Sequence, residues 1–401
     1  MSISVQERYF SWNRILLLAV GLWPYHQSRF ARFQAAFGFS ILTSFVVFLF
    51  SRLWFADYSI EFNSQLLCMS TYYMFLITKY VSFWINIEPI RYLLEQFQYI
   101  YKTLKNSKEI AIYDKYAIIA KRITIGLTMV AICNLVCFIA MLSWPFILDM
   151  IMPQNESYVQ LFIVHMTEYF AIQEKYFYLF LLHLYVVSAV AGVSFLATGT
   201  MLLSCLKHIC GILRIASYRF DRAIPATLQS ITLKNETIIY KELIYAVDIH
   251  RKAMECAKFF MDNMERSLLV LTMITVLCMS LNLYGIFQVK SSGQDMGKTM
   301  GHLLFVFFLF LYLFTGNYAG QEIVDCNNYM FLTLYNAPWY LAPLQIQKFI
   351  LFLLQRSNKT FTLSIGGLFT LSIECFGSEN VFICLQLVSA SISYLTVMLS
   401  F

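Results

Sequence analysis

The chain has 401 residues, of which 59% are hydrophobic and only 13% are charged, and its mean hydropathy is +0.63. Soluble domains carry about 25% charged residues, so this composition excludes a soluble globular protein. It indicates several membrane helices, each needing roughly 20 residues to cross a hydrocarbon core about 30 Å thick. The net charge of +6 does not indicate nucleic acid as a partner, because the basic residues flank apolar segments and form no patch on a soluble module.

The first apolar run, "ILLLAVGLW", is too short to cross a membrane and is followed by Pro24. It also lacks the small-residue cleavage site of a signal peptide. Seven longer apolar segments follow, and each is predicted to be a membrane span. They cover residues 35–56, 66–87, 123–148, 177–204, 267–288, 300–320 and a last segment within 367–401. The predicted fold class is an all-α membrane protein with seven transmembrane helices.

Basic residues orient these helices. Twenty-four Lys and Arg residues lie on one side of the predicted spans and four lie on the other. The positive-inside rule therefore places the N-terminus in the cytoplasm, and an odd number of spans places the C-terminus outside the cell. The outer loop 149–176 contains a sequon at Asn155, which we predict to be glycosylated. A G-protein-coupled receptor has the opposite orientation.

Two features of the inner half follow from periodicity and charge. Residues 239–262 show apolar side chains at helical spacing with charges between them, so helices 4–7 are expected to extend into a cytoplasmic bundle. This cytoplasmic anchor region covers about 205–266 and 321–366. Lys79 lies about two turns from the inner end of the second span, and we expect its ammonium to snorkel to the interface.

Catalytic patterns are missing from the sequence. It contains no P-loop, GxSxG or HExxH, and its ten cysteines include no CxxC spacing. We therefore predict no enzyme activity, catalytic residue, metal or cofactor. His183 is either a ligand contact or a hydrogen-bonded interior histidine. A secondary transporter is the alternative from another class, although the chain lacks internal repeats. Glu374, in the last segment, is either part of a cation pathway or a carboxylate at the level of the inner headgroups.

The stretch "YNAPWYLAPLQIQKFILFLLQRSNKTFTLSIGGLFTLSIECFGS" resembles the C-terminal region of the insect odorant receptor family. "WNRILLLAVGLWP" and "IASYRFDRAI" are similar to the same family, so the resemblance covers essentially all of 1–401 as a single receptor domain. The sister family of gustatory receptors is the near alternative, because "SYLTVMLSF" has the spacing of its ending. The "PWYLAP" element favours the odorant branch.

The resemblance implies an odorant-gated, non-selective cation channel in the plasma membrane of olfactory sensory neurons. Four subunits would surround one pore, and a tuning subunit would assemble with a co-receptor. The longer cytoplasmic loop typical of the co-receptor is missing here, which indicates a ligand-tuning subunit. The implied partners are the co-receptor in a heterotetramer, small volatile odorants, permeant cations and the lipid bilayer, with no nucleic acid.

Site residues follow from the same resemblance. Ligands would bind in the aromatic and Met-rich outer half of the bundle, and the candidates are Tyr72, Tyr73, Phe138, Met141, Trp144, Phe180, His183 and Tyr284. The first part of the seventh helix would anchor the subunits through Trp339, Tyr340, Pro343, Gln347 and Lys348. The second part would line the pore, with the gate at Val397 and with Ser393 and Phe401 one turn to either side on the same face. Glu374 lies nearer the start of this segment.

The last segment is longer than the family pattern. Family members run from the carboxylate of "LSIE" to the tyrosine near the end in about a dozen residues, whereas here Glu374 and Tyr394 are separated by twenty positions. Deleting 379–386, "ENVFICLQ", restores the family length. "FICLQ" matches what a pyrimidine-rich tract ending in CAG would encode, so we hypothesise that these eight residues are retained intron sequence.

Overall fold

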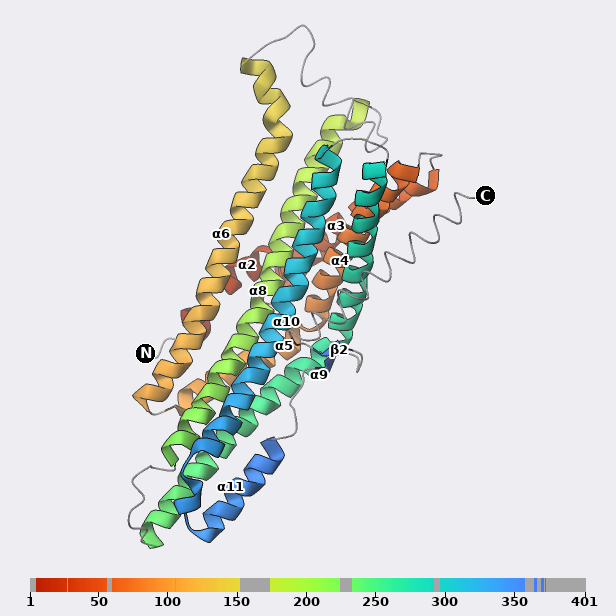
Figure 1. The fold of residues 1–401 in the computed structure, drawn as a ribbon. Helices are drawn as coiled ribbons and strands as arrows, with labels where there is room; N and C mark the ends of the chain where they lie inside the picture. Colours follow the sequence, from red (N-terminus) through yellow and green to blue (C-terminus); the bar gives the residue numbers. More distant parts are fainter. Residues whose placement is uncertain are drawn as a thin grey trace.

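A computed structural model describes residues 5–26, 28–55, 60–104, 106–151, 174–223, 233–291, 296–357, 364–365, 369–370 and 372. This part of the chain is almost entirely helical (Figure 1). Its elements are α1 (Val5–Tyr9), α2 (Ser11–Ala19), α3 (Arg29–Phe55), α4 (Ile60–Ile85), α5 (Ile87–Thr103), α6 (Ser107–Ile151), η1 (Glu174–Tyr176), α8 (Phe177–Ala223), α9 (Leu233–Ser291), α10 (Met296–Asn336), η2 (Trp339–Leu341), α11 (Leu344–Ser357), β1 (Ser364–Ile365) and β2 (Phe369–Thr370).

Two short strands depart from the expectation of an all-helical chain. β1 and β2 pair antiparallel, with Ser364 opposite Thr370 and Ile365 opposite Phe369. In the sequence a glycine pair separates them, and glycine disfavours the continuation of a helix. The pair contacts α9, where Ile365 is buried in the main core.

The longest helices exceed the thickness of a membrane. α6, α8, α9 and α10 contain 45, 47, 59 and 41 residues. At 1.5 Å per residue these helices are about 60–90 Å long, against about 30 Å of hydrocarbon. Each can therefore cross the bilayer and continue beyond it, as expected for a bundle with a cytoplasmic extension.

Five of the described helices are long and apolar enough to cross a membrane, namely α3, α6, α8, α9 and α10. The predicted second span, 66–87, falls on α4, which is not among these five. α4 carries Lys79 and several tyrosines, which lower its hydropathy. Most of the predicted seventh span, 367–401, lies outside the described residues, and Phe369–Thr370 near its start form strand β2 where a helix was predicted. The seven-span topology stays a prediction.

The short apolar run near the N-terminus forms α2 and the turn after it. Gly21 ends this element with a φ of 72°, and a side chain there would meet the Ala31 carbonyl oxygen at 2.5 Å. Only glycine fits this turn. Asn13 on α2 donates a hydrogen bond to Thr200 of α8 at 3.1 Å. The run therefore packs against the bundle and does not extend into a spanning helix.

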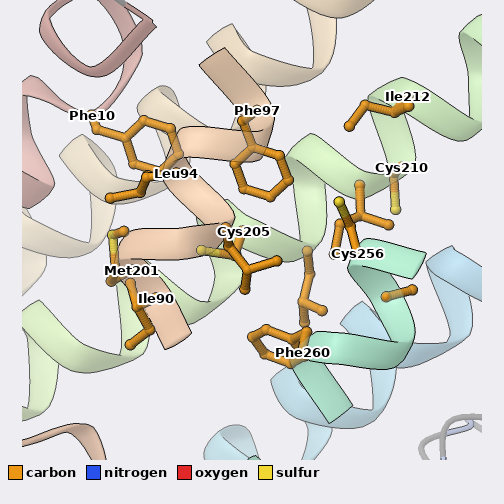
Figure 2. Packing of buried hydrophobic residues seen from close by; sticks show 14 of the residues in the cluster. Phe10, Ile90, Leu94, Phe97, Met201, Cys205, Cys210, Ile212, Cys256 and Phe260 are labelled. Atoms are coloured by element: carbon orange, nitrogen blue, oxygen red, sulfur yellow. The ribbon is translucent and has the colours of Figure 1, made fainter. Parts of the chain in front are cut away.

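The main core lies where α5, α8 and α9 meet. Figure 2 shows Phe10, Leu94 and Phe97 facing Met201 and Cys205, with Cys256 and Phe260 on the adjoining helix. His208 is buried in the same cluster, where its ring stacks on Phe10 at 4.6 Å and its Nδ1 lies 2.8 Å from the Tyr113 hydroxyl. This packing holds the N-terminal helices against α5, α8 and α9.

A second cluster joins the ends of four helices at the lower end of Figure 1, beside α11. It contains Phe220 of α8, Leu243 of α9, Leu334 of α10 and Ile350 of α11, all at least 99% buried. The cluster packs α11 against α8, α9 and α10 at this end of the bundle.

Candidate ligand-binding site

The predicted ligand residues on α4 divide between two neighbouring clusters. Tyr72 and Tyr73 are consecutive, so they point about 100° apart on the helix. Tyr73 packs against Phe45 of α3, with 4.6 Å between ring centroids. Tyr72 faces α10, where it contacts Phe305 at 5.0 Å and Phe308 at 6.1 Å. The two tyrosine rings meet edge to face at 5.8 Å, and α4 therefore links both clusters.

The cluster on the α3 side contains two more of the predicted residues. Phe180 of α8 lies 5.4 Å from Phe48 of α3 and is 7% exposed. Nε2 of His183 lies 3.0 Å from the Ser44 hydroxyl, and its ring contacts Phe45 at 5.7 Å. This hydrogen bond supports the second of the two interpretations of His183, a hydrogen-bonded histidine of the bundle.

The three ligand residues predicted on α6 have different surroundings. Its outer half stands apart from the other helices in Figure 1, and Leu142 is its one buried side chain among residues 130–151. Phe138 reaches Tyr185 of α8 at 6.5 Å. Met141 and Trp144 are 63% and 56% exposed. At about 100° per residue they point roughly 100° and 160° away from Leu142 around the helix. The structure thus brings Phe138 to the bundle and places the other two on its outer surface.

Tyr284 lies half-buried on α9, close to a polar contact that sequence analysis did not identify. The side-chain oxygen of Asn282 is 3.0 Å from Nδ1 of His302 on α10. An ideal Cβ on Gly285 would lie 2.8 Å from the His302 ring, so this glycine leaves the space that the imidazole fills. The contact fixes α9 against α10 at the level of Tyr284.

The cluster on the α10 side of Tyr72 continues along α8 and α10, and we call it the aromatic column. Successive ring centroids are 5–6 Å apart, as aromatic pairs prefer. The contacts are Tyr72–Phe308 at 6.1 Å, Phe308–Phe195 at 5.1 Å, Phe195–Tyr312 at 5.8 Å and Tyr312–Phe75 at 5.0 Å. Of these five residues, the candidate ligand set contains only Tyr72. The others come from three helices, and their alignment depends on packing that a single sequence does not report.

Lys79 lies at the far end of the aromatic column, and its placement corrects the expectation of snorkelling. The side chain is 5% exposed and does not reach an interface. Its Nζ lies 3.8 Å from the Phe195 ring centroid and 4.5 Å from that of Tyr312. The ring faces attract the cation, and the helix packing leaves room for it. The lysine therefore belongs to the interior of the bundle.

The predicted anchor residues surround η2. The Gln347 side chain donates to the backbone oxygens of Tyr340 at 3.0 Å and Ala342 at 2.8 Å, and the Trp339 indole donates to the Tyr335 oxygen at 3.2 Å. Pro343 is half-buried, whereas Tyr340 and Lys348 are exposed. Gln347 and Trp339 thus hold the turn between α10 and α11, and the exposed pair is available for contacts with another chain.

Several predicted positions lie outside the described residues. These are Asn155, Glu374, Ser393, Val397 and Phe401. Within the described ranges no group of three or more His, Cys, Asp or Glu side chains is arranged to hold a metal ion.

Comparison with known proteins bears on the whole arrangement. A solved structure of the insect olfactory receptor OR5 from Machilis hrabei in complex with eugenol has a TM-score of 0.73. The likeness covers 97% of this chain and 98% of that one at 13% sequence identity. The structure of the same receptor described without eugenol gives a TM-score of 0.72 at 14% identity, over 96% and 97% of the two chains. At these identities the likeness establishes the fold.

Sequence comparison gives a second result. The chain is 22% identical over 149 residues to the odorant receptor coreceptor of Ooceraea biroi, a match that covers 37% of this chain and only 30% of the coreceptor. A family model described as 7tm Odorant receptor matches residues 59–378, which is most of the chain. The protein is thus a multi-pass membrane protein with the helical fold of an insect olfactory receptor, and it belongs to the 7tm odorant receptor family.

Proposed function

We propose that this chain is the odorant-tuning subunit of a heteromeric, odorant-gated, non-selective cation channel. The observation that carries the proposal is the set of aromatic side chains shared by α3, α4, α8 and α10 in a chain of this family. Apolar walls with a few polar groups suit small volatile molecules. Membership of a receptor family also agrees with the lack of catalytic motifs in the sequence.

Ligand binding would act on the channel through α10. Tyr72 of α4 packs against Phe305 and Phe308 of α10, and the far end of α10 shares a buried cluster with α11. A ligand that separates these rings would shift α10, and α11 would move with it. Such a ligand opens the channel only to the extent that it binds the open arrangement more tightly than the closed one.

The pore would be lined by the segment after α11. By resemblance the gate lies at Val397, with Ser393 and Phe401 on the same face, and Glu374 would face the cation path. A ring of valines excludes ions by dewetting and conducts when the helices separate. We expect Val397→Ala to raise the current recorded without odorant, because a smaller side chain widens the ring.

The proposed partners are a co-receptor in a heterotetramer, odorants, permeant cations and the bilayer of a neuronal plasma membrane, with the N-terminus in the cytoplasm. Subunit contacts would form around η2 and α11, where Trp339, Pro343 and Gln347 shape the turn and Tyr340 and Lys348 are exposed. Residue Asn155 would face the extracellular side.

Whole-cell recording from cells that express this chain with the co-receptor tests the proposal. We expect odorant-evoked cation currents that require both chains. Tyr72→Ala should raise the half-maximal odorant concentration about tenfold, because a buried aromatic contact contributes roughly 1.5–3 kcal/mol. Met141→Ala is the matched control, because Met141 is 63% exposed. The absence of odorant-evoked current, together with saturable uptake driven by an ion gradient, would indicate a transporter and overturn the proposal.

A further inference from the structure

Lys79 is the buried cation of the bundle that the proposed function leaves without a role. The next residue, Tyr80, fixes the position of this part of α4, because its hydroxyl lies 3.0 Å from the Val20 oxygen and 3.1 Å from the Ala35 oxygen. Lys79 is turned to the other side, toward α8 and α10. With 5% of its surface exposed, the side chain is withdrawn from solvent.

The space around the ammonium is bounded by rings and by a glycine. Phe195 and Tyr312 present their faces to Nζ at 3.8 and 4.5 Å. Gly199 lies one helical turn after Phe195, and an ideal Cβ there would be 3.2 Å from Nζ. The missing side chain at Gly199 therefore leaves the ammonium the room that it occupies.

No acidic group compensates this charge within the part of the chain that the structure describes. The ion pairs found there involve other cations, such as Lys207 with Glu322 and Arg219 with Glu109. An ammonium has three N–H donors. Aromatic faces attract its charge, but they do not accept strong hydrogen bonds from these donors as a carboxylate does. A charge inside the membrane is costly unless an opposite charge accompanies it.

The aromatic column connects this ammonium to the candidate ligand site. It begins at Tyr72 and passes through Phe308 and Phe195 to Tyr312, with ring contacts of 5.1–6.1 Å. A molecule lying among these rings would have an apolar environment along its length and a positive charge at one end. That distribution matches an organic acid, which has an apolar chain and one anionic group.

We propose that Lys79 binds the carboxylate of acidic odorants, whose hydrocarbon part lies along the aromatic column. This inference rests on the proposed odorant-receptor function and names its ligand class. The acid binds as the carboxylate that it already is at neutral pH, and the carboxylate with the ammonium forms an ion pair of zero net charge. Charge-assisted hydrogen bonds from Nζ to the carboxylate oxygens are about twice as strong as neutral ones.

The test compares straight-chain carboxylic acids with the primary alcohols of equal length. The receptor is co-expressed with the co-receptor and recorded as wild type, Lys79→Met and Gly199→Ala. We expect the wild type to respond to acids at concentrations about tenfold lower than to alcohols, since hydrogen bonds to charged groups contribute about that factor. Lys79→Met should remove this preference and leave the alcohol response. Equal preference in the wild type and in Lys79→Met overturns the inference.

Gly199→Ala keeps the lysine and gives an independent test if Lys79→Met fails to fold. The added Cβ crowds Nζ, so acid potency should fall while alcohol potency is unchanged. A second readout is the melting midpoint of the purified complex, which a ligand raises when it binds the folded state. Hexanoic acid should raise the midpoint of the wild type and not that of Lys79→Met. A rise of the same size in both proteins, or in neither, contradicts the proposal.

The two readouts separate this inference from the proposed function. Stabilisation by acids that depends on Lys79, without any odorant-evoked current, would refute the channel function and support the acid site. Odorant-evoked currents that do not distinguish acids from alcohols would support the channel function and refute the acid site.

Discussion

The ion pair between Glu109 and Arg219 gives a quantitative test of how α6, α8 and α9 are held together. Glu109 lies in the first turn of α6, and Arg219 lies near the end of α8. The guanidinium donates to both carboxylate oxygens, with Nε–Oε1 at 2.8 Å and Nη2–Oε2 at 3.0 Å, and Nη1 donates to the Tyr245 oxygen of α9 at 3.1 Å. One arginine thus joins three helices.

Burial sets the size of the expected effect. The two side chains are only 12% and 10% exposed, so their charges have lost most of their contact with water. Removing one partner from such a pair leaves an uncompensated charge and typically costs about 3–5 kcal/mol. Glu109→Leu should therefore destabilise the protein by about 3 kcal/mol, because the Tyr245 carbonyl still accepts from Arg219. The double variant Glu109→Leu/Arg219→Met should lie close to the wild type, since hydrophobic replacement of a whole buried pair is often neutral.

The measurement is the midpoint of thermal aggregation of detergent-solubilised protein, taken at a fixed heating rate because membrane proteins of this size unfold irreversibly. Glu95→Leu is the matched control. Glu95 pairs with Arg91, and both side chains are about half exposed, so that pair contributes about 0–1 kcal/mol. Equal shifts for Glu109→Leu and Glu95→Leu would refute the argument from burial. A double variant as unstable as Glu109→Leu would show that the unpaired charge is not the cause.

Three further predictions concern other parts of the chain. Burial lowers the pKa of His208, which lies beyond the predicted span 177–204, to about 3, whereas it is about 6.5 in an unfolded chain. The stability that the neutral His208 contributes to the folded state is complete above pH 6.5 and is lost as the pH falls toward 3. Acidification from pH 7.5 to 5.5 should therefore lower stability by about 1 kcal/mol, and thermal midpoints should show a smaller loss in His208→Phe. Asn155→Gln should migrate as a smaller, glycosidase-insensitive band, and unchanged migration would contradict the predicted glycosylation of Asn155. Deleting residues 379–386 should increase odorant-evoked current at equal surface expression, and a smaller current would show that the segment is needed.

The long helices could be predicted from the sequence because a run of apolar residues reports its own environment. Five of the predicted spans overlap α3, α6, α8, α9 and α10, and no partner is needed to recognise such a run. The periodic residues 239–262 likewise fall inside the single helix α9. The ends of the helices are harder to predict, since α6 begins at Ser107, well before its apolar stretch.

In the candidate site, the sequence predicts which residue types are present but not which of them face one another. Aromatic composition predicts Tyr72, Tyr73 and Phe180, which pack within the bundle, but it does not report which face of α6 turns inward. Met141 and Trp144, predicted on the same basis, are exposed. Lys79 was assigned to the interface because a single sequence reports its depth and not its neighbours. The rings that hold its ammonium come from α8 and α10, more than 100 positions away in the chain.

The last residues of the chain, 379–401, follow the part that matches the family model. The family model matches residues 59–378, and the match stops at the position before Glu379, where the extra segment begins. Eight added residues lengthen a helix by about 12 Å and rotate the downstream side chains by roughly 80° about its axis. A helix with this insertion cannot keep both Glu374 and Val397 in family register. The chain beyond 386 again has a smooth apolar texture that ends in "SYLTVMLSF". The family model matches none of residues 379–401. Deleting 379–386 restores the spacing expected from the resemblance, so this deletion is the variant in which the hypothesis of retained intron sequence is tested first.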